Sequence, residues 1–376
     1  MEMEENVIIK IAQITSVHNE NSTRIFYKEC VTLANNGYNI IYIVPTDKDK
    51  YINGVKIKAV NKPKKRFERF VVTLWKIYKI ALLENADIYH FHDPELISVG
   101  LLLKLRSKKV IYDVHEDYSK QILSKKWIGN KYFRKIVAFL FNIFEQIGVM
   151  FFNRIIAATP DIARKFPKNK TIILRNFPIL KLIDNAAPIN YKKDKPVIIY
   201  AGGLTKIRGI REIVHAMEYI NDDAELWLLG KWENERFKEE CKKLKGWKHT
   251  KYLGFKKLEE VYRLMKIADI GVFLIYPKKR HKVGLPTKAF EYMACSLPIV
   301  LSDFPYRREV FGDCALFADP NNVYDIANKI NNLIRDPALA LKLEENGRSM
   351  VEKEYNWEIE SKKLLQVYEE LLGKSI

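Results

Sequence analysis

The chain has 376 residues, of which 48% are hydrophobic, and its formal net charge is +18. This length exceeds the usual size of one domain, so we expect two domains, each with its own core. The four cysteines are scattered, with no CxxC and no Cys/His cluster, which argues against a disulfide framework or a zinc site and suits a reducing compartment.

No segment is predicted to span a membrane. The first residues are acidic before the sequence becomes apolar, so we expect no secretory signal. Polar and charged residues interrupt the most apolar long segment, 136–158, which leaves no uncharged stretch of about 18 residues, the length that a bilayer requires. We expect this segment to form a buried or membrane-contacting helix followed by a strand, in a soluble or peripheral protein.

The positive charge is concentrated in the first half of the chain. Residues 1–200 contain 34 Lys and Arg against 19 Asp and Glu, whereas residues 201–376 contain 30 against 27. The excess is densest at 62–70, 104–109 and 125–135, where basic residues alternate with Phe, Trp and Tyr. This pattern suits an anionic membrane surface or nucleic acid, and a solvated lysine-rich surface is the alternative. Because no nucleic-acid-binding module accompanies the charge, we expect no nucleic acid partner.

Short apolar runs alternate with longer amphipathic segments along the first half. We expect strands at 7–14, 39–44, 88–91, 110–114, 154–158 and 171–174, and helices at 24–35, 67–84 and 97–105. This alternation predicts a parallel sheet covered by helices on both faces.

The alternation begins again after a segment with three prolines, 176–196. We expect strands at 197–200, 225–229, 250–253, 270–274, 298–301 and 315–317, and helices at 210–220, 234–243 and 357–372. The sequence thus predicts two doubly wound α/β domains, and in such sheets ligands bind at the carboxyl ends of the strands.

The segment GLPTKAFEYMACSLPIV (284–300) predicts a turn, a helix and a strand. Gly284 permits a tight turn, Pro286 suits the first helical position, and the free amides of a helix start favour an anion. Lys288 adds positive charge, and the carboxylate of Glu291, about one turn further on, suits two vicinal hydroxyls of a ribose. Together these groups indicate a nucleotide, although a structural Lys–Glu pair on a capped helix remains open.

A second candidate is YAGGLTKIRGIREIV (200–214), a strand, a Gly-Gly turn, a basic loop and a helix. Gly202 and Gly203 permit close approach of a ligand to the backbone, and Arg208 supplies charge. The chain contains neither the dinucleotide-binding glycine pattern nor a phosphate-binding P-loop. A capping loop with ordinary surface basic residues fits this segment equally well.

Histidines and acids follow two predicted strands of the first half, in IYHFHDPEL (88–96) and VIYDVHEDY (110–118). His90, His92 and Asp93 are of metal-ligand type. We expect one of these two histidines to point inward and pack, and we favour no metal. For His115 we expect a polar role beside a substrate. A third polar loop, 16–31, enters a helix for which Ser22 is the predicted N-cap.

Taken together, these segments resemble glycosyltransferase family 4, the retaining nucleotide-sugar transferases of the GT-B fold. The likeness follows the family's order, through STRIFYKECVTLANNGY, ADIYHFHDPEL, VIYDVHED, YAGGL…RGI, KYLGF, GLPTKAFEYMACSLPIV and YNWEIESKKLLQVYEEL. The resemblance implies two Rossmann-like domains facing across a cleft. The first, 1–178 with the C-terminal helix 357–374, would bind the acceptor; 179–196 would be a linker, and 197–356 would bind the donor.

The resemblance also implies roles for single residues. The implied catalytic residues are His115, near the transferred sugar, and Arg208 and Lys288, at the diphosphate. The implied donor-binding residues are Gly202, Gly203, Arg208, Gly254, Gly284, Leu285, Pro286, Thr287, Lys288 and Glu291. Arg24, His92, Asp93 and Glu116 would lie on the acceptor side.

The sequence departs from the family pattern at three places. The first glutamate of the family's E-x7-E element, which in the family often touches donor-sugar hydroxyls, would fall on Val283. Gly202-Gly203 stands where a Gly-Arg pair is common, and Ser22 stands where an aspartate is common.

The implied activity is hexosyl transfer with retention, from a UDP- or GDP-linked sugar to a hydroxyl of a glycan or lipid-linked saccharide, in surface polysaccharide or glycoconjugate biosynthesis. We expect no cofactor and no metal. We expect a cytoplasmic protein at the inner face of the cell membrane, with 62–70 and 125–135 against anionic lipid. A nucleotide-sugar epimerase of the same fold and an inactive partner subunit are the alternatives.

Overall fold

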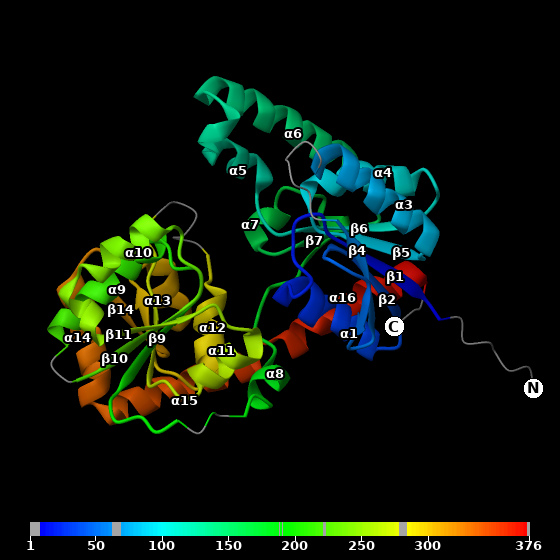
Figure 1. Ribbon diagram of the computed structural model, residues 1–376. Helices are drawn as coiled ribbons and strands as arrows, with labels where there is room; N and C mark the ends of the chain where they lie inside the picture. Colours follow the sequence, from blue (N-terminus) through cyan, green and yellow to red (C-terminus); the bar gives the residue numbers. More distant parts are fainter. Residues whose placement is uncertain are drawn as a thin grey trace, which may run out of the picture. The chain divides into compact units, whose positions relative to one another are not determined.

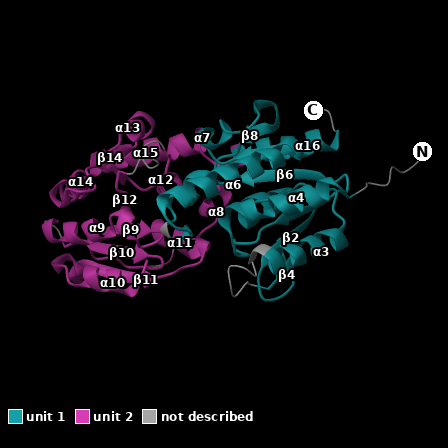
Figure 2. Cartoon of the chain, turned by 90° about the horizontal axis from the view of Figure 1, so that it is seen from above, with its two compact units in different colours: residues 1–176, 360–376 teal, residues 177–359 magenta. Residues whose placement is uncertain are grey.

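The chain forms two compact units, coloured separately in Figure 2. This computed structural model describes residues 8–61, 69–187, 189, 191–220, 223–277 and 284–373. Unit 1 comprises Met1–Asn176 and Glu360–Ile376, and unit 2 comprises Phe177–Ile359. Positions 62–68 of the predicted basic segment 62–70 therefore lie outside the described residues, and so does Val283.

Unit 1 is built on a sheet of eight strands in the order β3-β4-β2-β1-β5-β6-β7-β8. Figure 1 labels β1, β2 and β4 to β7 of this sheet. The strands are β1 (Lys10–Ile14), β2 (Asn39–Pro45), β3 (Lys50–Ile52), β4 (Val55–Val60), β5 (Ile88–Phe91), β6 (Lys109–Val114), β7 (Arg154–Ala157) and β8 (Thr171–Ile173). All neighbours pair in parallel except β3 and β4. The central strands are almost wholly buried, as expected for apolar runs covered on both faces.

Helical segments connect these strands. They are η1 (Thr23–Cys30), α1 (Val31–Asn35), η2 (Arg69–Thr73), α3 (Leu74–Glu84), η3 (Pro94–Leu96), α4 (Ile97–Lys104), α5 (Tyr118–Ser124), η4 (Lys126–Ile128), α6 (Lys131–Phe151), α7 (Pro160–Ala163) and η5 (Lys168–Lys170). The first, η1, is a π-helix whose N-cap is Ser22, as predicted, and it continues into α1. The chain ends with α16 (Trp357–Leu372), whose residues from Glu360 onward belong to unit 1.

Unit 2 contains a parallel sheet of six strands in the order β11-β10-β9-β12-β13-β14. The strands are β9 (Val197–Ala201), β10 (Glu225–Leu229), β11 (Thr250–Gly254), β12 (Ile270–Phe273), β13 (Ile299–Ser302) and β14 (Ala315–Ala318). The helical segments are α8 (Leu180–Asp184), η6 (Lys206–Arg208), α9 (Ile210–Ala216), η7 (Met217–Tyr219), α10 (Glu235–Lys242), η8 (Lys245–His249), α11 (Leu258–Met265), α12 (Thr287–Ala294), α13 (Pro305–Phe311), α14 (Val323–Arg335) and α15 (Pro337–Lys353).

The segment predicted as a linker, 179–196, is part of unit 2. It contains α8, and Ile183 within that helix is completely buried in the unit 2 core. The described residues of this segment therefore belong to a folded unit.

No helix among the described residues is long and apolar enough to cross a bilayer.

Candidate active site

Glycines end three neighbouring strands of unit 2. Gly202 follows β9, Gly230 follows β10, and Gly254 ends β11; all three have positive φ angles, of 156°, 144° and 76°. A Cβ on Gly230 would lie 1.8 Å from the carbonyl oxygen of Gly202, so no other residue fits there without moving the backbone. At this edge the backbones of Gly202 and Gly230 pack directly against each other, whereas the space beside Gly254 is open, and a ligand can approach the backbone closely there.

Arg208 lies over the Gly-Gly turn after β9. Its Nη1 is 3.0 Å from the position that a Cβ on Gly202 would occupy, and 3.4 Å from that position on Gly203. Tyr200 supports the turn by donating its hydroxyl to the Gly203 carbonyl at 3.1 Å. The structure thus brings together the glycines and the arginine that the sequence singled out.

Helix α12 carries the other predicted donor residues. Lys288 Nζ lies 2.5 Å from Glu291 Oε2, and the Tyr262 hydroxyl lies 3.5 Å from Glu291 Oε1. Glu291 is buried, whereas Lys288 and the residues from Gly284 to Thr287 are half-buried. Pro286 occupies the N-cap position, directly before Thr287, the first residue of the helix. The sequence had instead predicted Pro286 as the first residue of the helix. The Lys–Glu pair that the sequence left open as a structural alternative is present.

Tyr292 attaches α12 to the glycine-rich edge. Its hydroxyl accepts a hydrogen bond from the Ala201 amide at the end of β9, at 2.9 Å. Its ring covers Gly271 of β12, where a Cβ would lie 2.7 Å from the ring. The two candidate segments, 200–214 and 284–300, therefore meet on one strand, although Arg208 makes no hydrogen bond or ion pair with Lys288 or Glu291.

Arg307 is a candidate that sequence reasoning missed. It is 2% exposed, and its Nε and Nη1 have no hydrogen-bond partner in the described part of the chain. Its guanidinium lies 4.7 Å from the ring centre of Phe304 and 5.8 Å from that of Phe273, which ends β12. Burial lowers the pKa of Arg307 to about 10, so it stays charged at neutral pH. A buried cation without a carboxylate is costly, and it suits an anionic ligand. The paired arginines just after a predicted strand were the available signal.

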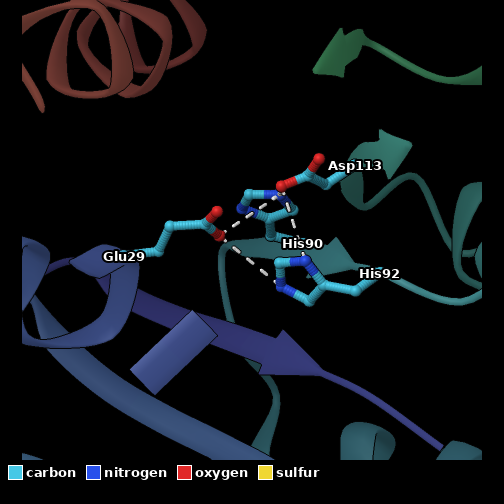
Figure 3. Close-up of side chains that lie close together, drawn as sticks. All are labelled: Glu29, His90, His92 and Asp113. Carbon is cyan, nitrogen blue, oxygen red and sulfur yellow. Dashed lines mark ion pairs between the residues drawn. The ribbon is translucent and has the colours of Figure 1, made fainter. Parts of the chain in front are cut away.

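In unit 1, four buried side chains from three segments converge (Figure 3). Glu29 comes from η1, His90 from β5, His92 from just beyond β5, and Asp113 from β6. His92 Nδ1 lies 3.5 Å from Asp113 Oδ2, and His92 Nε2 lies 3.6 Å from Glu29 Oε2. Both histidines are fully buried, so the prediction that only one points inward is wrong. Positions two apart in an extended chain share a face, which explains the arrangement.

Arg24 neutralises this cluster. Its Nη2 lies 3.0 Å and 2.9 Å from the two carboxylate oxygens of Asp113, and its Nε lies 3.1 Å from Glu29 Oε1. Burial opposes ionisation of Asp113, but Arg24 and His115 hold the pKa of that carboxyl well below its usual range. Burial, together with the charge of Asp113, raises the pKa of Glu29 well above its usual range. We infer an ionised Asp113 beside a protonated Glu29.

The four residues could offer ligand atoms to a metal, since these atoms all lie within 4.8 Å of one another. His92 Nε2, however, lies 2.7 Å from the amide oxygen of Gln13, which only accepts, so this nitrogen carries a proton and only Nδ1 of His92 could ligate. Arg24 already supplies the positive charge. We therefore interpret the cluster as a hydrogen-bonded network and assign no metal to it.

The predicted acceptor-side residues separate into a buried group and a surface group. Arg24, His92 and Asp93 are buried, and Asp93 accepts hydrogen bonds of 2.6 Å from Thr15 and from the Ser16 amide. His115 is 15% exposed, with its Nε2 at 3.4 Å from Asp113 Oδ2, and Glu116 is exposed. The buried group thus forms a floor beneath His115 and does not itself offer a surface.

Two members of this network were not predicted. Gln13 donates to the Tyr368 hydroxyl at 3.1 Å, and that hydroxyl lies 2.8 Å from His90 Nδ1. Tyr368 comes from α16, so the C-terminal helix completes the buried network of unit 1.

Two family models match this chain. The model described as Glycosyltransferase Family 4 matches residues 23–171, within unit 1, and the model described as Glycosyl transferases group 1 matches residues 184–350, within unit 2. Together they cover most of the chain. The chain belongs to glycosyltransferase family 4. The resemblance seen in the sequence is thereby confirmed, and the protein is a glycosyltransferase.

Relatives of this family 4 protein include named glycosyltransferases. An uncharacterized glycosyltransferase of Methanocaldococcus jannaschii is 25% identical over 343 residues, which are 89% of this chain and 90% of that protein. A capsular polysaccharide biosynthesis glycosyltransferase of Staphylococcus aureus is 23% identical over 258 residues, 63% of this chain and 67% of that protein.

Solved structures show that the chain has the predicted GT-B fold. Sucrose-phosphate synthase of Thermosynechococcus elongatus is similar with a TM-score of 0.76 and 19% identity, covering 98% of this chain and 100% of that one. Anabaena HepE, solved in complex with UDP-glucose, has a TM-score of 0.69 and 14% identity, covering 97% of this chain and 100% of that one.

Proposed function

We propose that this glycosyltransferase moves a sugar, with retention of anomeric configuration, from a UDP- or GDP-linked donor to a hydroxyl of a glycan or lipid-linked saccharide. The observation that carries the proposal is the carboxyl edge of unit 2. There Arg208 lies over the Gly202-Gly203 turn, and Tyr292 holds the Lys288–Glu291 helix to the same strand.

This edge offers the groups that a nucleotide diphosphate needs. Arg208 and the backbone from Gly202 to Gly203 would bind the diphosphate, and Lys288 with the start of α12 would add positive charge. Glu291 would accept hydrogen bonds from the two ribose hydroxyls after exchanging its contact with Lys288. Arg307, which is buried without an anion, would supply a further cation.

The step breaks the bond between the anomeric carbon and the diphosphate oxygen. The diphosphate leaves with the bonding electron pair, the acceptor oxygen bonds to the same face of the carbon, and the departing phosphate takes the acceptor's proton. Negative charge grows on the leaving group, so cations fixed in advance lower the barrier. Because these cations come from side chains, we propose that the reaction needs no metal or other cofactor.

Two relatives support the substrate classes. HepE is solved with UDP-glucose, which supports a nucleotide-sugar donor here. The S. aureus relative is named for capsular polysaccharide biosynthesis, which supports a saccharide acceptor in surface polysaccharide or glycoconjugate assembly. We propose that Glu116, which is exposed on unit 1, serves the acceptor, that His115 acts near the transferred sugar, and that the basic segments 62–70 and 125–135 rest on the inner face of the cell membrane.

The donor proposal is tested by thermal unfolding with UDP, GDP, ADP and their sugars. A ligand that binds only the folded state raises its stability, by about 2.7 kcal/mol at a hundredfold excess over Kd. We expect one nucleotide to raise the melting temperature of the wild type, and we expect Glu291→Gln to abolish most of that rise.

A matched control is Glu352→Gln, which removes an exposed carboxylate of unit 2 that pairs with Arg348. This variant should keep the full response. Equal responses in Glu291→Gln and the wild type would remove Glu291 from the nucleotide site, and no response to any nucleotide by the folded wild type would refute the donor proposal.

A further inference from the structure

Helix α6 of unit 1 exposes an apolar stripe along its entire length. Tyr132 is 76% exposed, Phe139 64% and Met150 63%. The exposed members recur every three or four residues and so share one face: Tyr132, Phe133, Ile136, Phe139, Leu140, Ile143, Phe144, Ile147, Met150 and Phe151. Single exposed apolar residues are ordinary, but a continuous stripe over about 31 Å of helix indicates an interaction surface.

The opposite face of α6 is committed to unit 1. Ala138, Glu145, Gly148 and Val149 are buried, and a Cβ on Gly148 would lie 2.7 Å from the side chain of Ile97 in α4. The amino-terminal part of α6 continues past α4 with α5 beside it (Figure 1). The apolar stripe is therefore held in place by the fold, since the helix cannot turn this face inward.

The charge around the stripe has one sign. Residues 118–144 contain six Lys and Arg and no Asp or Glu. Of these, Lys120, Lys125, Lys131 and Lys135 are exposed. Trp127 and Tyr132, near the amino-terminal end of α6, are also exposed, and such aromatic rings favour the level of lipid headgroups. An apolar stripe beside cations and aromatic rings is typical of a helix lying in the plane of an anionic membrane.

We propose that α6 inserts its apolar stripe into one leaflet of an anionic bilayer, lying parallel to the surface, while Lys125, Lys131 and Lys135 contact the headgroups. This deepens the membrane contact of the proposed function, on which it rests, because it adds insertion of 132–151 to electrostatic contact at 125–135. A second copy of the chain is a poorer partner for this surface, since segment 118–144 has six basic and no acidic residues, and two copies of it would repel each other.

The test is co-sedimentation of the full chain with vesicles of phosphatidylcholine alone or with equal phosphatidylglycerol. We expect binding to the anionic vesicles, and the double variant Phe139→Glu/Ile143→Glu should weaken it by more than about tenfold, because two inserted apolar groups are replaced by charges. Leu341→Glu, at an exposed position in unit 2, is the control and should bind as the wild type does.

Nucleotide-induced stabilisation, measured in the same variants, separates this proposal from the donor proposal. We expect the double variant to keep that stabilisation, which also shows that it is folded. Unchanged vesicle binding by the folded double variant would overturn the proposal. A wild-type dimer that the double variant dissociates, with no vesicle binding, would overturn it in favour of a second copy.

Discussion

Buried ionisable residues show how single side chains are tuned in unit 1. Asp113 is ionised because Arg24 donates hydrogen bonds to both of its oxygens. Neither oxygen of Glu29 has a hydrogen-bond partner among the described residues, and burial raises the pKa of Glu29. The Arg24 guanidinium donates hydrogen bonds to both oxygens of Asp113 but contacts only one oxygen of Glu29, so we infer that Glu29 keeps its proton. The network therefore holds His92 and His115 beside a single negative charge.

The raised pKa of Glu29 predicts that the stability of the folded protein depends on pH. A raised pKa means that the folded state binds this proton more tightly than the unfolded state does, so the stabilisation is full below about pH 4.3, the unfolded value, and is lost as pH rises through the folded value. Glu29→Gln copies the protonated form at every pH. The variant should gain stability over the wild type as pH rises from 5 to 8, by at most about 1.4 kcal/mol per pH unit.

Urea unfolding of the wild type and of Glu29→Gln across this pH range measures the difference in their free energies of unfolding. For the exposed control Glu352→Gln, the difference from the wild type should not change with pH. A constant difference between Glu29→Gln and the wild type would mean that Glu29 is already ionised in the folded protein.

At the scale of elements, the ends of strands carry the donor chemistry. A glycine with positive φ follows β9 and β10, and another is the last residue of β11. The amide of Gly230 donates a hydrogen bond to the Gly254 carbonyl at 2.8 Å. The edge is thus one continuous backbone surface, and its shape depends on glycine at several positions simultaneously.

Gly230→Ala tests this dependence. The added methyl would lie 1.8 Å from the Gly202 carbonyl oxygen, so the Gly-Gly turn has to move. We expect a loss of about 1–3 kcal/mol of stability together with loss of nucleotide-induced stabilisation. Gly37→Ala is the matched control, with a φ of 84° and open space around the new methyl, and it should lose stability only. An unchanged nucleotide response in Gly230→Ala would separate this edge from donor binding.

The sequence predicted most elements but not all of them. Apolar runs placed β5 and β10 at their observed bounds, because buried parallel strands are apolar throughout. The β3–β4 hairpin was missed, although Asn53-Gly54, with φ angles of 50° and 77°, is a favoured two-residue turn. Helices α14 and α15 were missed too, although Ile326, Ile330 and Leu333 of α14 recur every three or four residues and are buried.

At the scale of the whole molecule, local motifs predicted the family and most of the candidate donor residues. Gly202, Arg208 and Glu291 lie within short segments whose chemistry can be recognised in isolation. Arg307, Gln13 and Tyr368 could not be found in this way, because their roles depend on what surrounds them. Tyr368 reaches His90 from 278 residues further along the chain, and only the folded unit brings them together.

The two units divide the properties of the chain. Unit 1 carries the basic excess and the exposed stripe of α6, whereas unit 2 carries the glycine edge with its cations. This division fits an enzyme that takes its donor from water and finds its acceptor at a membrane.

Retaining transfer from a nucleotide sugar can be followed by proton NMR of the reaction with the nucleotide sugar that the thermal screen selects. We expect release of the nucleotide together with a transferred sugar, on acceptor or water, that keeps the donor's anomeric configuration. We also expect Arg208→Ala to slow this release by about a hundredfold or more, as loss of a preorganised charge does. A sugar that first appears with the opposite anomeric configuration would rule out the retaining mechanism.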